Sequence, residues 1–261
     1  FHRQNAERAR LWPHAMLSLA THDTKRGEDL RARINVLSEL PGEWEAAVTR
    51  WAQWNSRHKR EADGAALPDR PTEYLLYQTL VGAWEDGPSD AFVERIQQYM
   101  QKATREAKLH TSWINPDEEY DQALGDFVAA ILDPERAGPF LDDLAGFARR
   151  VACFGRINSL AQTLLKLTSP GVPDTYQGTE LWDLSLVDPD NRRPVDYERR
   201  RRALAELDAR AADDAGRAAL AAELLEGAAD GRIKLYMVAE ALRHRRANQR
   251  LYTTGAYTPL E

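Results

Sequence analysis

The sequence predicts a mainly α-helical protein that contains two short buried strands. Apolar side chains recur at intervals of three and four residues through most of the chain, which is the spacing of an amphipathic helix. Only two apolar runs, at 15–20 and 172–176, have the length and the abrupt polar ends of buried strands. With 261 residues, of which 43% are hydrophobic, the chain can bury a core as one large domain or two small ones.

Three apolar stripes predict the helices of the first half of the chain. They consist of Trp44, Val48 and Trp51, of Leu76, Leu80 and Ala83, and of Phe92, Ile96 and Tyr99. Because Trp44 and Trp51 share one stripe, we expect both rings in the core and not against a ligand.

The later helices follow from start and stop signals. One is expected to begin at Pro116 with Asn115 as its cap and to end near Leu132. A long apolar helix is predicted for 140–167, and further helices for 196–210, 211–232 and 234–246.

The two strand-like runs are consistent with parallel strands that are buried on both faces. A complete (β/α)₈ barrel needs eight strand–helix alternations in about 250 residues. This chain uses most of a similar length for helices. If both strands belong to such a barrel, the remaining strands lie outside this sequence.

The composition argues against several classes of protein. The net charge is -6, with 35 basic and 41 acidic residues, which disfavours nucleic acid as a partner. No apolar run could span a membrane, and neither a metal-binding Cys/His spacing nor a glycine-rich phosphate loop occurs. The single cysteine, Cys153, excludes an intrachain disulfide and favours a reducing, cytoplasmic location. Its apolar neighbours predict that it is buried.

A polar segment, 21–26, follows the first strand-like run at once. Catalytic groups of α/β barrels lie at the carboxyl ends of strands, and His22, Asp23, Lys25 and Arg26 could hydrogen-bond several sugar hydroxyls there. The alternative, given equal weight, is a strand-to-helix turn in which Asp23 or Thr24 caps a helix over 28–40.

Two later segments offer further polar groups. Residues 170–180 resemble a strand that enters a tight turn and ends at Glu180. The 181–197 segment is dense in Asp, Asn and Arg, and a long ordered loop of this kind is usually functional. Its candidate sugar ligands are Trp182, Asp188, Asp190, Arg192 and Arg193, together with the distant Trp113. In the alternative, Arg–Asp pairs only brace the loop.

Two long stretches of the sequence resemble maltooligosyltrehalose synthase. They are ATHDTKRGEDLRARINVLSELPGEW, from Ala20 to Trp44, and NSLAQTLLKLTSPGVPDTYQGTELWDLSLVDPDNRRPVDY, from Asn158 to Tyr197. The stretches 74–84 and 102–117 are similar to that family as well. A His-Asp pair after a strand is common across the α-amylase superfamily, but THDTKR together with PDNRRPVDY is much narrower.

The resemblance implies a mainly α fold: a helical insertion domain plus the last part of a TIM-type (β/α)₈ barrel, strands seven and eight with their flanking helices. It places the end of the barrel with strand seven and the His-Asp loop at 1–36. The helical insertion would occupy 37–139. The last barrel helices and strand eight with the substrate loop would occupy 140–261. The chain then resembles the C-terminal portion of the catalytic region.

The resemblance also implies a reaction. The family converts the reducing-end α-1,4 linkage of a maltooligosaccharide to an α,α-1,1 linkage by intramolecular transglycosylation with retention, a step of trehalose biosynthesis. Asp23 occupies the position of the superfamily's third catalytic carboxylate, His22 matches a histidine that contacts the same sugar, and Lys25 matches a substrate-binding lysine. The nucleophile and the acid/base lie on earlier strands, so the chain alone is expected to be inactive.

The expected partner is a maltooligosaccharide, without a cofactor, a metal, a nucleic acid or a membrane. Self-association is also expected, because a partial barrel would expose strand edges. Two alternatives remain: another glucan hydrolase or branching enzyme of the α-amylase superfamily, and a helical interaction domain without a sugar site. In the interaction domain, His22, Asp23 and the 188–197 loop would be scattered, whereas a sugar site requires them to converge.

Overall fold

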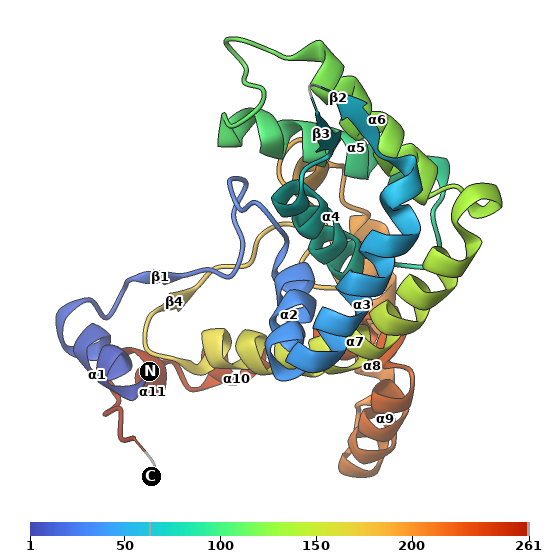
Figure 1. Cartoon of the computed structure of the whole chain (residues 1–261). Coiled ribbons are helices and arrows are strands. Elements are labelled where there is room, and N and C mark those ends of the chain that lie inside the picture. Colours follow the sequence, from blue (N-terminus) through green and yellow to red (C-terminus); the bar gives the residue numbers. More distant parts are fainter. Residues whose placement is uncertain (63, 260–261) are drawn as a thin grey trace. The chain divides into compact units, whose positions relative to one another are not determined.

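A computed structural model describes residues 1–62 and 64–259 (Figure 1). Its contacts divide the chain into two compact units. The first unit consists of residues 1–29, 156–184 and 191–261, and the second of residues 30–155 and 185–190. Both units are therefore discontinuous in sequence. The three-segment division expected from the sequence stays a prediction.

The first unit contains a two-stranded parallel sheet. Strand β1 (Met16–Leu17) lies beside β4 (Val172–Pro173) in Figure 1, and Met16 pairs with Val172. Both predicted strands are present and parallel, although each is shorter than expected. The expectation that they are buried was wrong, because Met16 is 70% and Val172 is 42% exposed. The unit's helices are α1 (His2–Leu11), the end of α7 (Pro134–Thr168), α8 (Tyr197–Arg210), α9 (Asp214–Glu226), α10 (Arg232–Ala247) and α11 (Gln249–Thr254).

The core of the first unit joins its last helices. It is an aliphatic cluster of Leu181, Leu207, Leu220, Leu224 and Leu235. Asp196 and Asp213 cap α8 and α9 by accepting hydrogen bonds from main-chain amides of the first turn. The helix expected over 211–232 is therefore only partly correct, since α9 ends at Glu226 and a 3₁₀ turn at Ala228–Asp230 follows.

The second unit is a bundle of helices with one small hairpin. Its helices are most of α2 (Glu28–Val36), α3 (Pro41–Asn55), α4 (Arg70–Ala83), α5 (Asp90–Ala107), α6 (Glu118–Ile131) and the first part of α7. Short 3₁₀ turns at Leu37–Glu39 and Ser56–His58 follow α2 and α3. The hairpin, β2 (Arg60–Ala62) with β3 (Ala65–Leu67), is antiparallel.

Aromatic rings fill the core of the second unit. Trp51 is fully buried, and its ring centroid lies 5.5–5.7 Å from those of Trp44, Tyr77, Phe140 and Phe147. All four pairs are edge-to-face, the arrangement that the quadrupoles of aromatic rings favour. The expectation that Trp44 and Trp51 lie in the core is confirmed.

Three local expectations were wrong. The cap of α6 is Asp117 and not Asn115, because the Asp117 carboxylate accepts from the Tyr120 amide at 2.9 Å while Asn115 closes a turn with Ser112. The long helix α7 begins earlier than residue 140, at Pro134, with a kink at Ala137. Cys153 is exposed, because it falls on an outer face of this helix.

The mainly helical fold class is confirmed. Assignment of β1 and β4 to strands seven and eight of a barrel stays a prediction. Over residues 1–62 and 64–259, no helix has the length and apolar character that crossing a membrane would require.

Candidate substrate-binding site

The polar segment after β1 folds into a tight turn that presents His22 and Asp23. The amide of Thr24 donates to the carbonyl of Thr21 at 3.2 Å, and the amide of Thr21 donates to Oγ1 of Thr24 at 2.8 Å. These bonds involve only the ends of the turn, so the two side chains between them point outward. The side chains of His22 and Asp23 are 59% and 81% exposed, and Nε2 of His22 lies 3.3 Å from Oδ2 of Asp23.

The helix-capping alternative for this segment is wrong. Helix α2 begins at Glu28, so the residue before it is Gly27. Asp23 and Thr24 lie too far upstream for their side chains to cap the first turn of α2. Asp23 is therefore an accessible carboxylate with no capping role.

Asn191 joins this turn to the 188–197 loop. Its Nδ2 donates to the main-chain carbonyl of His22 at 2.9 Å, and its own carbonyl accepts from the Tyr176 hydroxyl at 3.0 Å. Three segments of the first unit, after β1, after β4 and at 191–193, thus converge. Of the 188–197 loop, Asn191 thus lies at the turn, whereas a sugar site formed by the whole loop stays a prediction. Neither Asn191 nor Tyr176 was predicted as a site residue, although they lie inside the segments 181–197 and 170–180.

Glu180 and Trp182 are held by protein partners in the same unit. Oε2 of Glu180 accepts from Nε of Arg200 at 2.9 Å, and Arg200 also donates to the carbonyl of Gly178 at 2.6 Å. Nε1 of Trp182 donates to the carbonyl of Ala228 at 2.7 Å. Both predicted ligands therefore have a bracing function, and their contact with sugar stays a prediction.

Asp188 and Asp190 belong to the second unit and are paired with α5. Both oxygens of Asp190 accept from Arg95, at 2.9 and 3.0 Å, and Asp188 accepts from Nζ of Lys102 at 2.7 Å. The amide of Leu186 also donates to Asp190 at 2.8 Å. These contacts support the loop-bracing alternative, with α5 as the source of the cations.

The remaining predicted ligands are cations and a tryptophan. Lys25, Arg192 and Arg193 are exposed, and Arg26 is half-buried. Trp113, in the second unit, is 56% exposed and stacks with the guanidinium of Arg105, 4.9 Å from its ring centroid. Their roles as ligands stay predictions.

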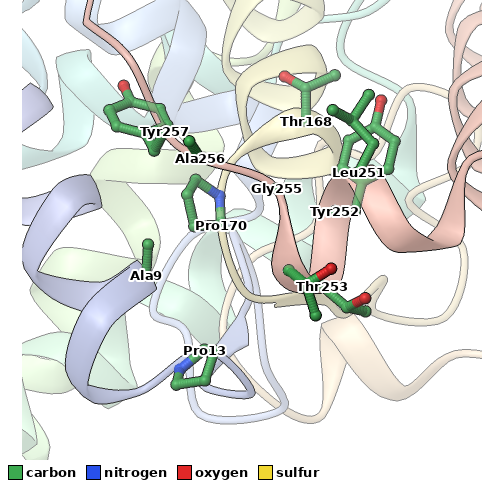
Figure 2. Close-up of a pocket in the computed structure, with 11 residues that line it drawn as sticks. Ala9, Pro13, Thr168, Pro170, Leu251, Tyr252, Thr253, Gly255, Ala256 and Tyr257 are labelled. Atoms are coloured by element: carbon green, nitrogen blue, oxygen red, sulfur yellow. The ribbon is translucent and has the colours of Figure 1, made fainter.

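The chemistry available at the Thr21–Thr24 turn is that of an accessible carboxylate beside an imidazole. Within the described part of the chain, no group of three or more His, Cys, Asp or Glu side chains is arranged to hold a metal. A separate cavity of about 320 Å³ lies in the same unit. Its lining residues include Pro13, Pro170 and Tyr257 (Figure 2). The described lining has no carboxylate or basic side chain, so this cavity does not provide acid–base groups.

No family model matches the chain. The chain is, however, 40% identical over 262 aligned residues to a Mycobacterium tuberculosis protein named as a maltooligosyl trehalose synthase. That alignment covers 100% of this chain and 29% of the relative. The chain corresponds to one region of the maltooligosyl trehalose synthases.

Solved structures agree with this assignment. A crystal structure of a maltooligosyl trehalose synthase matches 100% of the chain with 34% identity and a TM-score of 0.81, over 33% of its own length. The maltooligosyltrehalose synthase of Arthrobacter ramosus matches 96% of the chain with 37% identity and a TM-score of 0.73, over 29% of its length. The chain therefore spans about a third of the synthases that it matches.

Proposed function

We propose that this chain supplies one side of the active site of a maltooligosyl trehalose synthase. The observation that carries the proposal is the convergence of the Thr21–Thr24 turn with Asn191, which presents the Asp23 carboxylate to solvent on a supported loop. The full protein would convert the reducing-end α-1,4 linkage of a maltooligosaccharide to an α,α-1,1 linkage, a reaction of trehalose biosynthesis.

In this proposal Asp23 holds sugar hydroxyls while positive charge develops at the anomeric carbon. A carboxylate that interacts more strongly with the transition state than with the ground state raises kcat. His22 would hydrogen-bond the same sugar, and Lys25 would contact the substrate. Retention needs a nucleophile and an acid/base about 5–5.5 Å apart, and Asp23 cannot serve as both. We therefore expect the 261-residue chain by itself to have no synthase activity.

The proposal is tested with the full-length product of the gene and maltopentaose. Formation of a non-reducing product supports the synthase, whereas release of new reducing ends would favour a hydrolase. Asp23→Asn should lower kcat/KM by at least about 100-fold without changing the melting temperature, because the side chain is 81% exposed.

The matched control is Asp214→Asn, on α9 of the same unit, where the side chain is 97% exposed. This variant should keep wild-type kinetics. Equal activities of the Asp23→Asn and Asp214→Asn proteins would refute the role of Asp23.

A further inference from the structure

Three charged side chains form a fully buried cluster in the first unit. Nζ of Lys234, on α10, donates to Oε1 of Glu28 at 2.7 Å and lies 2.9 Å from both carboxylate oxygens of Asp29. The side chains are 0%, 1% and 4% exposed, respectively. An ammonium group has three donors, and this arrangement gives Nζ of Lys234 three acceptors.

Asp29 connects four segments of the chain at one point. Besides Lys234, its carboxylate accepts from the hydroxyl of Ser159 on α7 and, at 2.6 Å, from the main-chain amide of Asp183. Asp29 itself lies in the first turn of α2. The cluster therefore fixes the start of α2 relative to α7, to α10 and to the chain at Asp183.

The two segments of the unit that carry the candidate sugar ligands His22, Asp23 and Trp182 both adjoin this cluster. The turn with His22 and Asp23 ends just before α2, whose first residues are Glu28 and Asp29. Trp182 precedes Asp183, and its ring centroid lies 5.7 Å from Nζ of Lys234.

A glycine permits the start of α10 to lie close to the main chain at Trp182. Gly231, the residue before α10, has a φ of 85°, and a Cβ at this position would lie 3.1 Å from the amide nitrogen of Trp182. The beginning of α10 therefore packs directly against the chain that carries Trp182.

Thermodynamic stability alone does not explain such a cluster. Replacing a buried ion pair with apolar side chains of similar volume is often neutral or stabilising, because the charges lose their hydration. Because all three donors of Lys234 are used, these buried charged hydrogen bonds nevertheless restrict the geometry of the cluster, whereas an apolar contact tolerates sliding.

We propose that Lys234 is a positioning residue of the sugar site: through Asp29 and Glu28 it fixes the loops that present His22, Asp23 and Trp182. This inference rests on the proposed function. Lys234 is buried beneath these loops and does not contact the sugar itself.

The test compares Lys234→Met with Leu235→Ala in the full-length protein. Leu235 neighbours Lys234 on α10 and belongs to the apolar core, so its truncation weakens the packing of α10 and leaves the ion cluster in place. At a temperature well below both melting transitions, Lys234→Met should lower kcat for maltopentaose about 100-fold with a KM changed by less than about threefold. Leu235→Ala should keep both parameters within about threefold of wild type.

A triple variant that removes all three charges distinguishes loss of positioning from loss of folding. Glu28→Gln/Asp29→Asn/Lys234→Met removes the three charges of the cluster together, and the neighbouring buried Lys166 keeps its 2.8 Å bond to the carbonyl of Asp174, so folding should be retained. Its kcat should stay low, because the three-acceptor geometry at Lys234 is gone. Wild-type kcat in a folded Lys234→Met or triple variant, or an equal loss in Leu235→Ala, would overturn the proposal.

Amide hydrogen exchange gives a readout that needs no sugar. In Lys234→Met the amides of 21–26 and 180–184 should exchange about tenfold faster than in Leu235→Ala, relative to the amides of α8. If the wild-type protein forms no product from maltopentaose, the proposed function is refuted. The exchange rates of these loops would still test the positioning role of Lys234. Unchanged exchange in these loops would overturn the positioning even if the synthase reaction is present.

Discussion

The side-chain amide of Asn191 donates a 2.9 Å hydrogen bond to the main-chain carbonyl of His22, 169 positions earlier in the chain. This bond ties the turn that presents Asp23 to the polar loop that follows β4. It uses the backbone of His22, so the imidazole and the neighbouring carboxylate remain accessible.

Asn191→Ala should therefore weaken catalysis and leave the stability of the fold intact. Without the Nδ2 donor the turn gains freedom, and we expect kcat/KM for maltopentaose to fall about tenfold. The melting temperature should stay near that of wild type, because the bond lies at an exposed position. Asn248→Ala, which removes a similar 2.9 Å bond to the carbonyl of His244, is the control and should keep wild-type kinetics.

Breaking the Asp190–Arg95 pair should destabilise the second unit. The side chains are 12% and 17% exposed, and both carboxylate oxygens are used, so Asp190→Ala leaves a largely buried guanidinium without this partner. We expect a loss of about 2–3 kcal/mol in the free energy of unfolding. Urea denaturation measures it. The exposed pair of Arg150 with Glu43 gives the comparison, and Arg150→Ala should cost less than about 1 kcal/mol.

Trp51 offers a test of core packing with two grades of substitution. Trp51→Ala removes a fully buried ring and should cost about 3–5 kcal/mol. Trp51→Phe keeps most of the ring contacts and loses the 2.6 Å bond from Nε1 to Asp143, which still accepts from Arg50. It should cost about 1–2 kcal/mol. Equal unfolding midpoints for the two variants would contradict this assignment of the core.

The pKa of Lys234 predicts a specific alkaline instability. Burial acts to lower this pKa, but Asp29 and Glu28 outweigh it, so the pKa lies above its ordinary value of 10.5. A cation with a raised pKa in the folded state stabilises that state fully below its unfolded pKa and loses this contribution as the pH rises through the folded pKa. The difference in urea midpoint between wild type and Lys234→Met should be constant from pH 7 to about pH 10 and shrink above it. A difference in urea midpoint that grows above pH 10.5 would contradict a raised pKa of Lys234 in the folded state.

The helices and the two paired strands were predictable because they rest on local patterns. Stripes such as Trp44, Val48 and Trp51 repeat at the helical period, and β1 and β4 are apolar runs with polar ends. The hairpin of β2 and β3 was missed because three residues on each side are too few to show an alternation. Asn115 was mistaken for a cap because Asp117, two residues later, is an equally good acceptor.

The candidate site was predictable only in part. The His22–Asp23 turn follows a strand directly and could be found from sequence alone. The partners of Asp188 and Asp190 lie on α5, far away in sequence, so nothing near the loop indicated them. Lys234 stands between Ile233 and Leu235 at the start of a helix, and a lone lysine there resembles a solvated residue. Only the structure shows that the Lys234 side chain is fully buried, with its Nζ 2.9 Å from the carboxylate of Asp29.

The separation of Lys234 from its partners also sets an order of folding during synthesis. Glu28 and Asp29 leave the ribosome 206 and 205 residues before Lys234, whose ammonium group donates to both carboxylates. Every residue of the helical second unit lies at or before position 190, so that unit can finish while α10 is still unmade. Contacts between distant positions form late because their loops are costly to close. Until Lys234 emerges, Glu28 and Asp29 lack this partner, so the segments beside the cluster become fixed late.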